Sequence, residues 1–144
     1  MTLNNIKEIT QPEVIEKFGE DYKRLGMFEK DRLSSPATEK TQWFANEFTC
    51  AALYWSRQTK VRIKGTITRP EHRAKGHGSS MLLFLLEHIK QKSIEINKKI
   101  EVESYASDLD WYLNNGFNVK MKTPWGLTLV SKIIDPRGDL SDLF

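Results

Sequence analysis

One segment, residues 79–93, constrains the fold of this chain more than any other. It has the spacing of a helix, and its first two turns are apolar on all sides, so those turns must be buried against other elements. Strands are predicted on both sides of it, at residues 60–68 and 99–105, where apolar and polar residues alternate. A buried helix between two strands indicates an α/β protein with a mixed central β-sheet flanked by helices.

The rest of the chain adds shorter elements on either side of this core. Before it we predict, in order, a short strand within residues 3–9, a helix at 12–26, a second helix from Ser35 toward Asn46, and a strand at 48–56. After it we predict a helix at 107–115 and two strands joined by a hairpin-like turn, at 117–122 and 127–134. A chain of 144 residues makes one domain, here residues 1–134, followed by a short acidic tail at 135–144.

Composition excludes several classes of protein. An apolar fraction of 39% and a charged fraction of 28% are typical of globular proteins and do not suit a disordered chain. The longest apolar run, Met81–Leu86, is far too short to span a bilayer, and the N-terminal residues contain no apolar signal region. We therefore expect a cytoplasmic protein that does not contact membranes. Cys50 is the only cysteine, and the histidines lack ligand spacing, so we expect no disulfide and no metal site.

The net charge of +3 comes from one short block of the chain. The surplus of Lys and Arg lies in residues 57–75, which suggests as partner either the phosphates of a small cofactor or a nucleic acid backbone. Alternation places Lys60, Arg62 and Lys64 on one face of the predicted strand. A small cofactor cannot engage that whole row, so the row is either solvated or meets a longer polyanion. We expect the first, with DNA binding no tighter than the roughly micromolar non-specific level.

The chemistry is predicted to lie in Arg69–Ser80, with the sequence RPEHRAKGHGSS, between the basic strand and the buried helix. Gly76 and Gly78 at a helix N-terminus leave backbone N–H groups free to bind an anion, which the helix dipole also favours. A Walker loop would need a lysine after the last glycine, and a dinucleotide fingerprint would need a third glycine where Met81 stands. The pattern present is Arg-x-x-Gly-x-Gly, which begins at Arg73.

This pattern resembles the pyrophosphate-binding motif of the GNAT (Gcn5-related N-acetyltransferase) superfamily, whose members bind acetyl-coenzyme A. Its context agrees, because a strand ending at Ile67-Thr68-Arg69-Pro70 precedes the motif and a helix follows it. Further on, Trp111–Phe117 resembles the family's helix–strand junction, in which an aromatic residue and a tyrosine precede Gly-Phe. The resemblance covers residues 60–134 well and the first half of the chain only by topology.

Two departures from the family pattern are expected. The family usually has an extra antiparallel strand before the one that carries the motif, and here only the pair at 48–56 and 60–68 is predicted, which indicates a compact variant. The asparagine that often follows the fifth strand is not evident, and Ser104–Ser107 takes its place. The second departure leaves the contacts to pantetheine undefined.

The resemblance implies that acetyl-CoA is the co-substrate and that a primary amine attacks its thioester directly. The pantetheine arm would pair with the main chain of Ile67, Thr68 and Arg69. Backbone N–H groups of the loop would hold the pyrophosphate: Arg73, Ala74, Lys75, Gly76, His77, Gly78 and Ser79. Tyr112 is the candidate acid for the leaving thiolate, since a phenol with a pKa near 10 can protonate it, and Tyr105 is a weaker substitute. Glu71 is the candidate base acting through water, with Glu101 and Glu103 as alternatives.

Three functions remain open at this point. The leading one is an N-acetyltransferase whose acceptor is a small-molecule or protein amine. The alternatives are a GNAT-fold protein that modifies or binds nucleic acid, as some phage-encoded relatives do, and a non-catalytic acyl-CoA-binding module. By the resemblance, Trp43, Phe44 and Trp125 lie in segments that border the acceptor cleft, with core packing as the alternative. Trp125, at a hairpin tip, is also a candidate for a homodimer contact.

Overall fold

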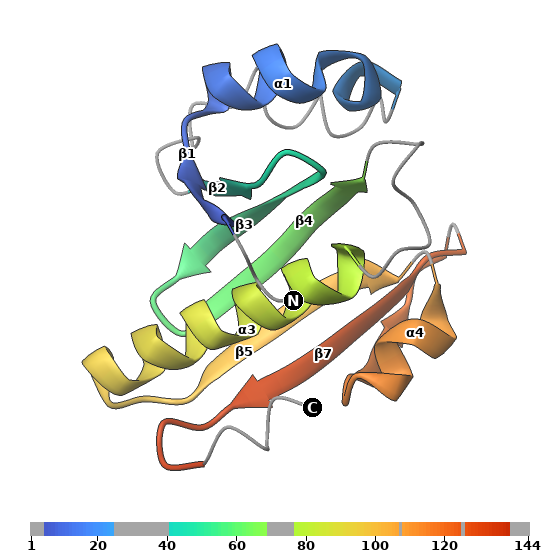
Figure 1. The fold of residues 1–144 in the computed structure, drawn as a ribbon. Coiled ribbons are helices and arrows are strands. Elements are labelled where there is room, and N and C mark those ends of the chain that lie inside the picture. Colours follow the sequence, from blue (N-terminus) through green and yellow to red (C-terminus); the bar gives the residue numbers. More distant parts are fainter. Residues whose placement is uncertain (1–4, 25–40, 69–76, 107, 125, 139–144) are drawn as a thin grey trace. The chain divides into compact units, whose positions relative to one another are not determined.

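The computed structural model describes residues 5–24, 41–68, 77–106, 108–124 and 126–138. The elements in chain order are β1 (Lys7–Ile9), α1 (Gln11–Arg24), β2 (Thr41–Ala45), β3 (Thr49–Arg57), β4 (Lys60–Thr68), α3 (His77–Ile96), β5 (Ile100–Ala106), α4 (Leu109–Asn114), β6 (Asn118–Lys122) and β7 (Thr128–Ile134). The seven strands follow the order β1-β2-β3-β4-β5-β7-β6 in one sheet (Figure 1). Because β4 and β5 are parallel and the other assigned pairs are antiparallel, the sheet is mixed. The predicted fold class is confirmed.

The chain forms two compact units. The first contains residues 1–54 and 64–84, and the second contains residues 55–63 and 85–144. Strand β4 and helix α3 each contribute residues to both units. Each unit has its own buried apolar side chains, and each is described separately below.

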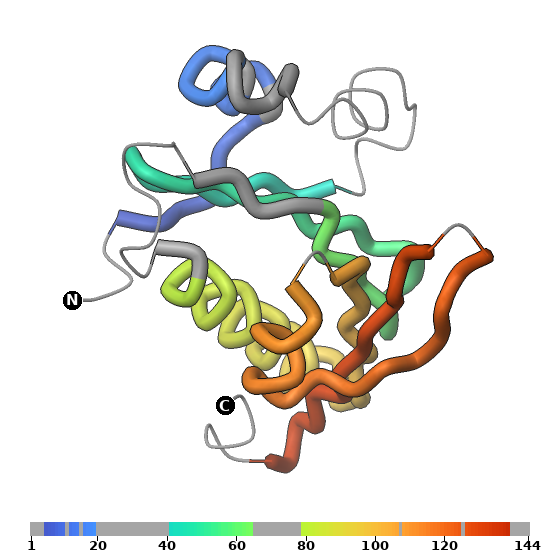
Figure 2. Tube along the Cα trace, turned by 90° about the vertical axis from the view of Figure 1, so that its right-hand side faces the viewer, coloured from blue at the N-terminus to red at the C-terminus, as the bar shows by residue number. Residues whose placement is uncertain are grey.

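Helix α1 lies along β1 and β2 in the first unit (Figures 1 and 2). Its start is a capping box: the Thr10 backbone N–H donates to Glu13 Oε1 over 3.1 Å, and the Glu13 N–H donates to Thr10 Oγ1 over 3.4 Å. The helix then buries Val14 and Phe18 in an apolar cluster with strand residues. The strand members of this cluster are Ile9, Trp43, Ala45, Cys50 and Ala52.

The helix predicted from Ser35 toward Asn46 is wrong over its last part. Residues 35–40 lie outside the described residues, but Thr41–Ala45 is strand β2, paired with β1 on one side and β3 on the other. Trp43, Phe44 and Ala45 are all buried, as a strand inside a sheet requires when both of its faces are covered. Phe44 contacts the ring of Phe84 at a centroid distance of 5.5 Å. Trp43 and Phe44 are therefore core residues.

Strand β2 also corrects the expectation that an antiparallel strand is missing before the motif-bearing strand. β2 pairs antiparallel with β3 from Thr41↔Tyr54 to Ala45↔Cys50. The small Ala52 lies opposite the large Trp43, and Cys50 lies opposite Ala45; all four belong to the apolar cluster that α1 joins. The chain therefore has the strand that the sequence analysis did not find.

The second unit is built on β5, which has a partner on each side. It pairs parallel with β4 from Lys60↔Glu101 to Ile63↔Ser104, and antiparallel with β7 along its whole length. β7 then pairs with β6, and these two strands run side by side as the predicted hairpin (Figure 2). The strands predicted at 99–105, 117–122 and 127–134 and the helix predicted at 107–115 are confirmed, with no bound shifted by more than two residues.

A buried lysine holds the chain where it leaves β7. Lys90 of α3 is 4% exposed, and its Nζ donates to the carbonyl oxygens of Asp135 and Gly138. The Asp135 carboxylate accepts the backbone N–H of Arg137 over 2.9 Å and closes the turn. The first residues of the predicted acidic tail are thus anchored, and residues 139–144 lie outside the described part of the chain.

Candidate active site

Helix α4 is short, and both of its ends are fixed. A side chain caps its start, and the backbone conformation of a glycine ends it. At its start, Asp108 Oδ1 accepts the Trp111 backbone N–H over 3.2 Å. At its end, Gly116 has φ +88, in the left-handed region that favours glycine, and the Phe117 N–H returns to the Tyr112 carbonyl over 3.1 Å. This is the helix–strand junction that the sequence indicated around Gly116 and Phe117. It positions Tyr112 on the buried side of α4.

Tyr112 is 8% exposed and is held on three sides. Its ring meets Trp111 and Phe117 edge-on, with centroids 5.0 Å and 5.3 Å away. The Ser104 hydroxyl donates to the Tyr112 phenol oxygen over 2.9 Å. Burial raises the pKa of Tyr112 above 10.0, and the hydrogen bond from Ser104 acts in the opposite direction. The phenol is therefore protonated at neutral pH and carries one specific polar contact.

Ser104 lies on β5 at the last position where β5 is in register with β4. In the sequence, Ser104 stands out only as part of the segment that replaces an asparagine. Its contact with Tyr112 could not be predicted because the two residues belong to different elements. The only sequence signal is the alternation of β5, which places Ser104 on the same face as Val102 and Ile100.

Lys132 is a second residue whose place could not be predicted. Lys132 lies on β7 and is 6% exposed. Its Nζ donates to the Asn115 carbonyl oxygen over 3.0 Å. The same Nζ lies 6.0 Å from the centroid of the Phe117 ring. A positive charge at the C-terminus of α4 complements the helix dipole and occupies a carbonyl that the helix leaves unpaired.

Gly116 and Gly126 provide a matched pair of substitutions that tests this arrangement. Both have φ near +90, so alanine costs about 1–2 kcal/mol at either position. Only at Gly116 would the new Cβ also meet a neighbour, the Lys132 Nζ at 2.6 Å, whereas the Gly126 Cβ would meet nothing within 4 Å. We expect Gly116→Ala to lower the free energy of unfolding by about 1 kcal/mol more than Gly126→Ala, because Lys132 must give up its carbonyl.

Urea unfolding of the two variants measures this difference. Adding Lys132→Met should remove the extra cost at Gly116 and leave the cost at Gly126 unchanged. Equal losses for Gly116→Ala and Gly126→Ala in the wild-type background would contradict the contact with Lys132.

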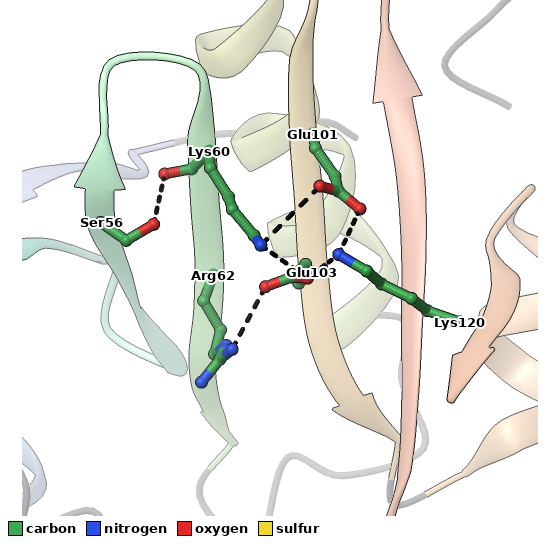
Figure 3. A network of polar contacts seen from close by, with 6 residues as sticks. All are labelled: Ser56, Lys60, Arg62, Glu101, Glu103 and Lys120. Carbon is green, nitrogen blue, oxygen red and sulfur yellow. Dashed lines mark hydrogen bonds and ion pairs between the residues drawn. The ribbon is translucent and has the colours of Figure 1, made fainter. Parts of the chain in front are cut away.

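A network of charges occupies one face of β4 and β5 in the second unit (Figure 3). Its centre is Glu103, whose side chain is 3% exposed. Lys120 Nζ lies 2.5 Å from Glu103 Oε2, Arg62 Nη2 lies 3.2 Å from Oε1, and Lys60 Nζ lies 3.5 Å from Oε2. Lys120 also contacts Glu101 at 2.8 Å. One buried carboxylate is therefore paired with three cations from two other strands, β4 and β6.

This network gives part of the basic row partners within the protein. Lys60 and Arg62 are paired with glutamates of β5, and their side chains stay 27% and 32% exposed. Arg62 also lies over the Tyr105 ring, with Cζ 5.1 Å from the centroid. In the first unit, Lys64 Nζ lies 6.0 Å from the centroid of the Tyr54 ring. The positively charged residues of β4 therefore make contacts within the protein.

The network also bears on the choice of base. Burial alone would raise the pKa of Glu103, but hydrogen bonds from Lys120 and Arg62 outweigh it and hold that pKa below 4.5. The same contacts, led by the hydrogen bond to Glu101, raise the pKa of Lys120. A carboxylate surrounded by cations is a weak base, so Glu103 is poorly suited to accept the proton of an amine. Glu71 lies outside the described residues.

The lowered pKa of Glu103 predicts how stability depends on pH. A carboxylate with a depressed folded-state pKa stabilises the protein above its unfolded value of 4.5 and loses that contribution as the pH falls through the folded value. We expect Glu103→Gln to lower the free energy of unfolding by about 1–3 kcal/mol at pH 7 and by progressively less below pH 4.5. Urea unfolding between pH 7 and pH 3 measures this, and a pH-independent difference would contradict the network.

The predicted cofactor segment is described only at its two ends. Arg69, Arg73, Ala74, Lys75 and Gly76 lie outside the described residues. Ile67 and Thr68 are the last residues of β4, and α3 begins at His77, so Gly78 and Ser79 lie in its first turn. That turn contains no acidic residue, whereas the first turns of α1 and α4 contain Glu13 and Asp110. A helix start without a carboxylate suits an anionic ligand.

Within the described residues, no group of three or more His, Cys, Asp and Glu side chains is placed to hold a metal ion. Among the helices of the described ranges, none has the length and apolar character needed to cross a membrane.

Comparison with known proteins identifies the fold. Neither protein-family models nor curated protein sequences match this chain. Among solved structures, Tetrahymena GCN5 superimposes with a TM-score of 0.69 at 13% identity, covering 94% of this chain and 99% of that one. A GNAT family acetyltransferase from Elizabethkingia anophelis with acetyl-CoA bound matches with a TM-score of 0.63 at 15% identity, covering 88% and 95%. A KacTA–DNA complex matches with a TM-score of 0.63 at 14% identity, covering 90% and 92%. The chain has the GNAT acyl-CoA N-acyltransferase fold.

Proposed function

We propose that this protein is an N-acetyltransferase that uses acetyl-CoA to acetylate a primary amine, on a small molecule or a protein, in the cytoplasm. The observation that carries the proposal is the GNAT fold over nearly the whole chain, with a buried tyrosine on α4 where the sequence predicted an acid. Fold alone does not assign a reaction, so the chemistry of the individual residues must support it.

The residues of the predicted loop fit a phosphorylated cofactor. Backbone N–H groups from Arg73 to Ser79 are proposed to hold the pyrophosphate, supported by the first turn of α3 with no acidic residue. The main chain of Ile67–Arg69 is proposed to pair with the pantetheine arm as an added strand would. When bound, acetyl-CoA supplies the thioester carbon for the attack and a thiolate as leaving group.

Tyr112 is proposed to protonate the departing thiolate. Its environment suits that role in two ways. Burial keeps the phenol protonated at neutral pH, and the packed rings of Trp111 and Phe117 fix its position. A thiolate whose thiol has a pKa near 8.5 is a weaker base than a phenolate, so the transfer requires a phenol that is held against the sulfur.

The amine's proton is proposed to leave through water to Glu71. The cation network around Glu103 argues against that residue, and Glu101 contacts Lys120 in the same network. Direct attack needs no covalent enzyme intermediate, so positioning and proton transfer carry the catalysis.

The nucleic-acid alternative is the less favoured one. A similar fold occurs in the KacTA–DNA complex, but in this chain Lys60 and Arg62 are engaged by Glu103. The non-catalytic alternative differs from the proposal only in turnover.

The test is a screen of amines by thiol release, with the mass of each product measured. Isothermal titration with acetyl-CoA and with CoA should accompany it. The proposal expects micromolar binding of acetyl-CoA and a product heavier by one acetyl group with at least one class of primary amine. Binding without turnover across small amines and peptide amines would favour the non-catalytic module, and no binding would overturn the proposal.

A further inference from the structure

We propose that Ser104 is a positioning residue for Tyr112, holding the phenol oxygen by a hydrogen bond that strengthens as the phenol gives up its proton. This inference rests on the proposed function. Both residues belong to the second unit and both are buried, Ser104 at 3% and Tyr112 at 8% exposed.

The hydrogen bond is the principal polar contact of both hydroxyls. The Ser104 Oγ lies 2.9 Å from the Tyr112 phenol oxygen, and its other acceptor, the Tyr105 carbonyl oxygen, lies at the limiting distance of 3.5 Å. Buried hydroxyls keep partners because leaving one unpaired is costly. Ser104 therefore directs its proton toward Tyr112.

The direction of this bond matters for the chemistry. A phenol has one proton, and a serine that donates to the phenol oxygen leaves that proton free for another acceptor. In the proposed step the Tyr112 O–H bond breaks, its electron pair stays on the phenolate oxygen, and an S–H bond forms on the departing thiolate. Ser104 keeps its own proton, the amine's proton goes through water to Glu71, and after the step Glu71 releases a proton to solvent while the phenolate takes one from solvent.

Negative charge develops on the Tyr112 oxygen during this transfer. A hydrogen bond to an ionised oxygen is roughly twice as strong as one to a neutral oxygen. The Ser104 contact therefore stabilises the transition state more than the ground state, which raises kcat and leaves cofactor affinity almost unchanged. The ring itself is held by Trp111 and Phe117, so loss of the serine hydroxyl should not displace it.

A double-mutant cycle tests the inference. Ser104→Ala should lower kcat by about 3- to 30-fold, with an unchanged Kd for acetyl-CoA. In the Tyr112→Phe background the same substitution should have no further effect on kcat, because the phenol oxygen that accepts the Ser104 hydrogen bond is absent. Ser104→Thr, which keeps the hydroxyl, should restore most of the activity.

A second measurement does not depend on turnover. Tyrosine labelled with ¹³C at Cζ allows the ionisation of Tyr112 to be followed by NMR, with Tyr112→Phe used to assign its signal. The pKa of Tyr112 should rise in Ser104→Ala and return toward the wild-type value in Ser104→Thr.

The outcomes separate the two proposals. Additive losses of kcat in the cycle, or an unchanged pKa of Tyr112 in Ser104→Ala, overturn the role of Ser104. A wild-type protein without turnover overturns the proposed function, and the NMR titration then still decides whether Ser104 acts on the phenol.

Discussion

Gly78→Val should weaken the binding of acetyl-CoA by about 100-fold or more. Gly78 lies in the first turn of α3, next to backbone N–H groups that are proposed to hold the pyrophosphate. A branched side chain would occupy the space of the phosphate. Loss of two hydrogen bonds to a charged group, at about 1.5 kcal/mol each, corresponds to a factor of this size. Isothermal titration with acetyl-CoA measures the change.

The control for this variant is Gln91→Val. It introduces the same side chain at an exposed position of the same helix, so it reproduces the cost of a β-branched residue in α3 without approaching the loop. Gln91→Val should keep the wild-type Kd. An unchanged Kd in Gly78→Val would remove the cofactor assignment from the loop.

Tyr112→Phe should lower kcat by about 10- to 10⁴-fold and leave the Kd for acetyl-CoA nearly unchanged. The substitution keeps the aromatic ring and its edge-on contacts with Trp111 and Phe117. It removes only the proton that the proposed mechanism transfers. Steady-state kinetics with the best amine from the screen, together with isothermal titration, separates the two effects.

Tyr105→Phe is the partner experiment, because the sequence offers Tyr105 as the other candidate acid. Tyr105 follows Ser104 on β5 and so faces the opposite side of the strand, where Arg62 lies over its ring. A loss of kcat in Tyr105→Phe, with full activity in Tyr112→Phe, would transfer the acid role to Tyr105.

The parts of the fold that could be predicted from the sequence are those in which local periodicity and tertiary environment agree. The buried helix α3 and the alternating strand β4 are of this kind, since their patterns match the faces they bury. Thr41–Ala45 is not, because three successive buried residues, Trp43, Phe44 and Ala45, have neither a strand period nor a helix period. Only the neighbours β1 and β3 make this segment a strand, and those pairings depend on distant residues.

Some residues of the candidate site could also be predicted from the sequence, and others could not. Tyr112 and Gly116 could be found because they belong to one local junction with a recognisable spacing. Ser104, Lys132 and the charge network could not, because each contact depends on strand register. Lys60 meets Glu103 only because β4 and β5 pair in parallel with Lys60 opposite Glu101. A count of charges over residues 57–75 therefore cannot show that Lys60 and Arg62 lie against glutamates of β5.

The sharing of Glu103 among three cations makes the tolerance of these positions to mutation unequal. Any one of Lys60, Arg62 and Lys120 can be replaced while the carboxylate keeps two partners, and each of the three side chains is about 30% exposed and can reach water. Replacement of Glu103 by an apolar residue removes the partner that all three cations share, and leaves Glu101 as the remaining carboxylate beside Lys60 and Lys120. In a random library selected for folding, substitutions should accumulate readily at the three basic positions and rarely at position 103.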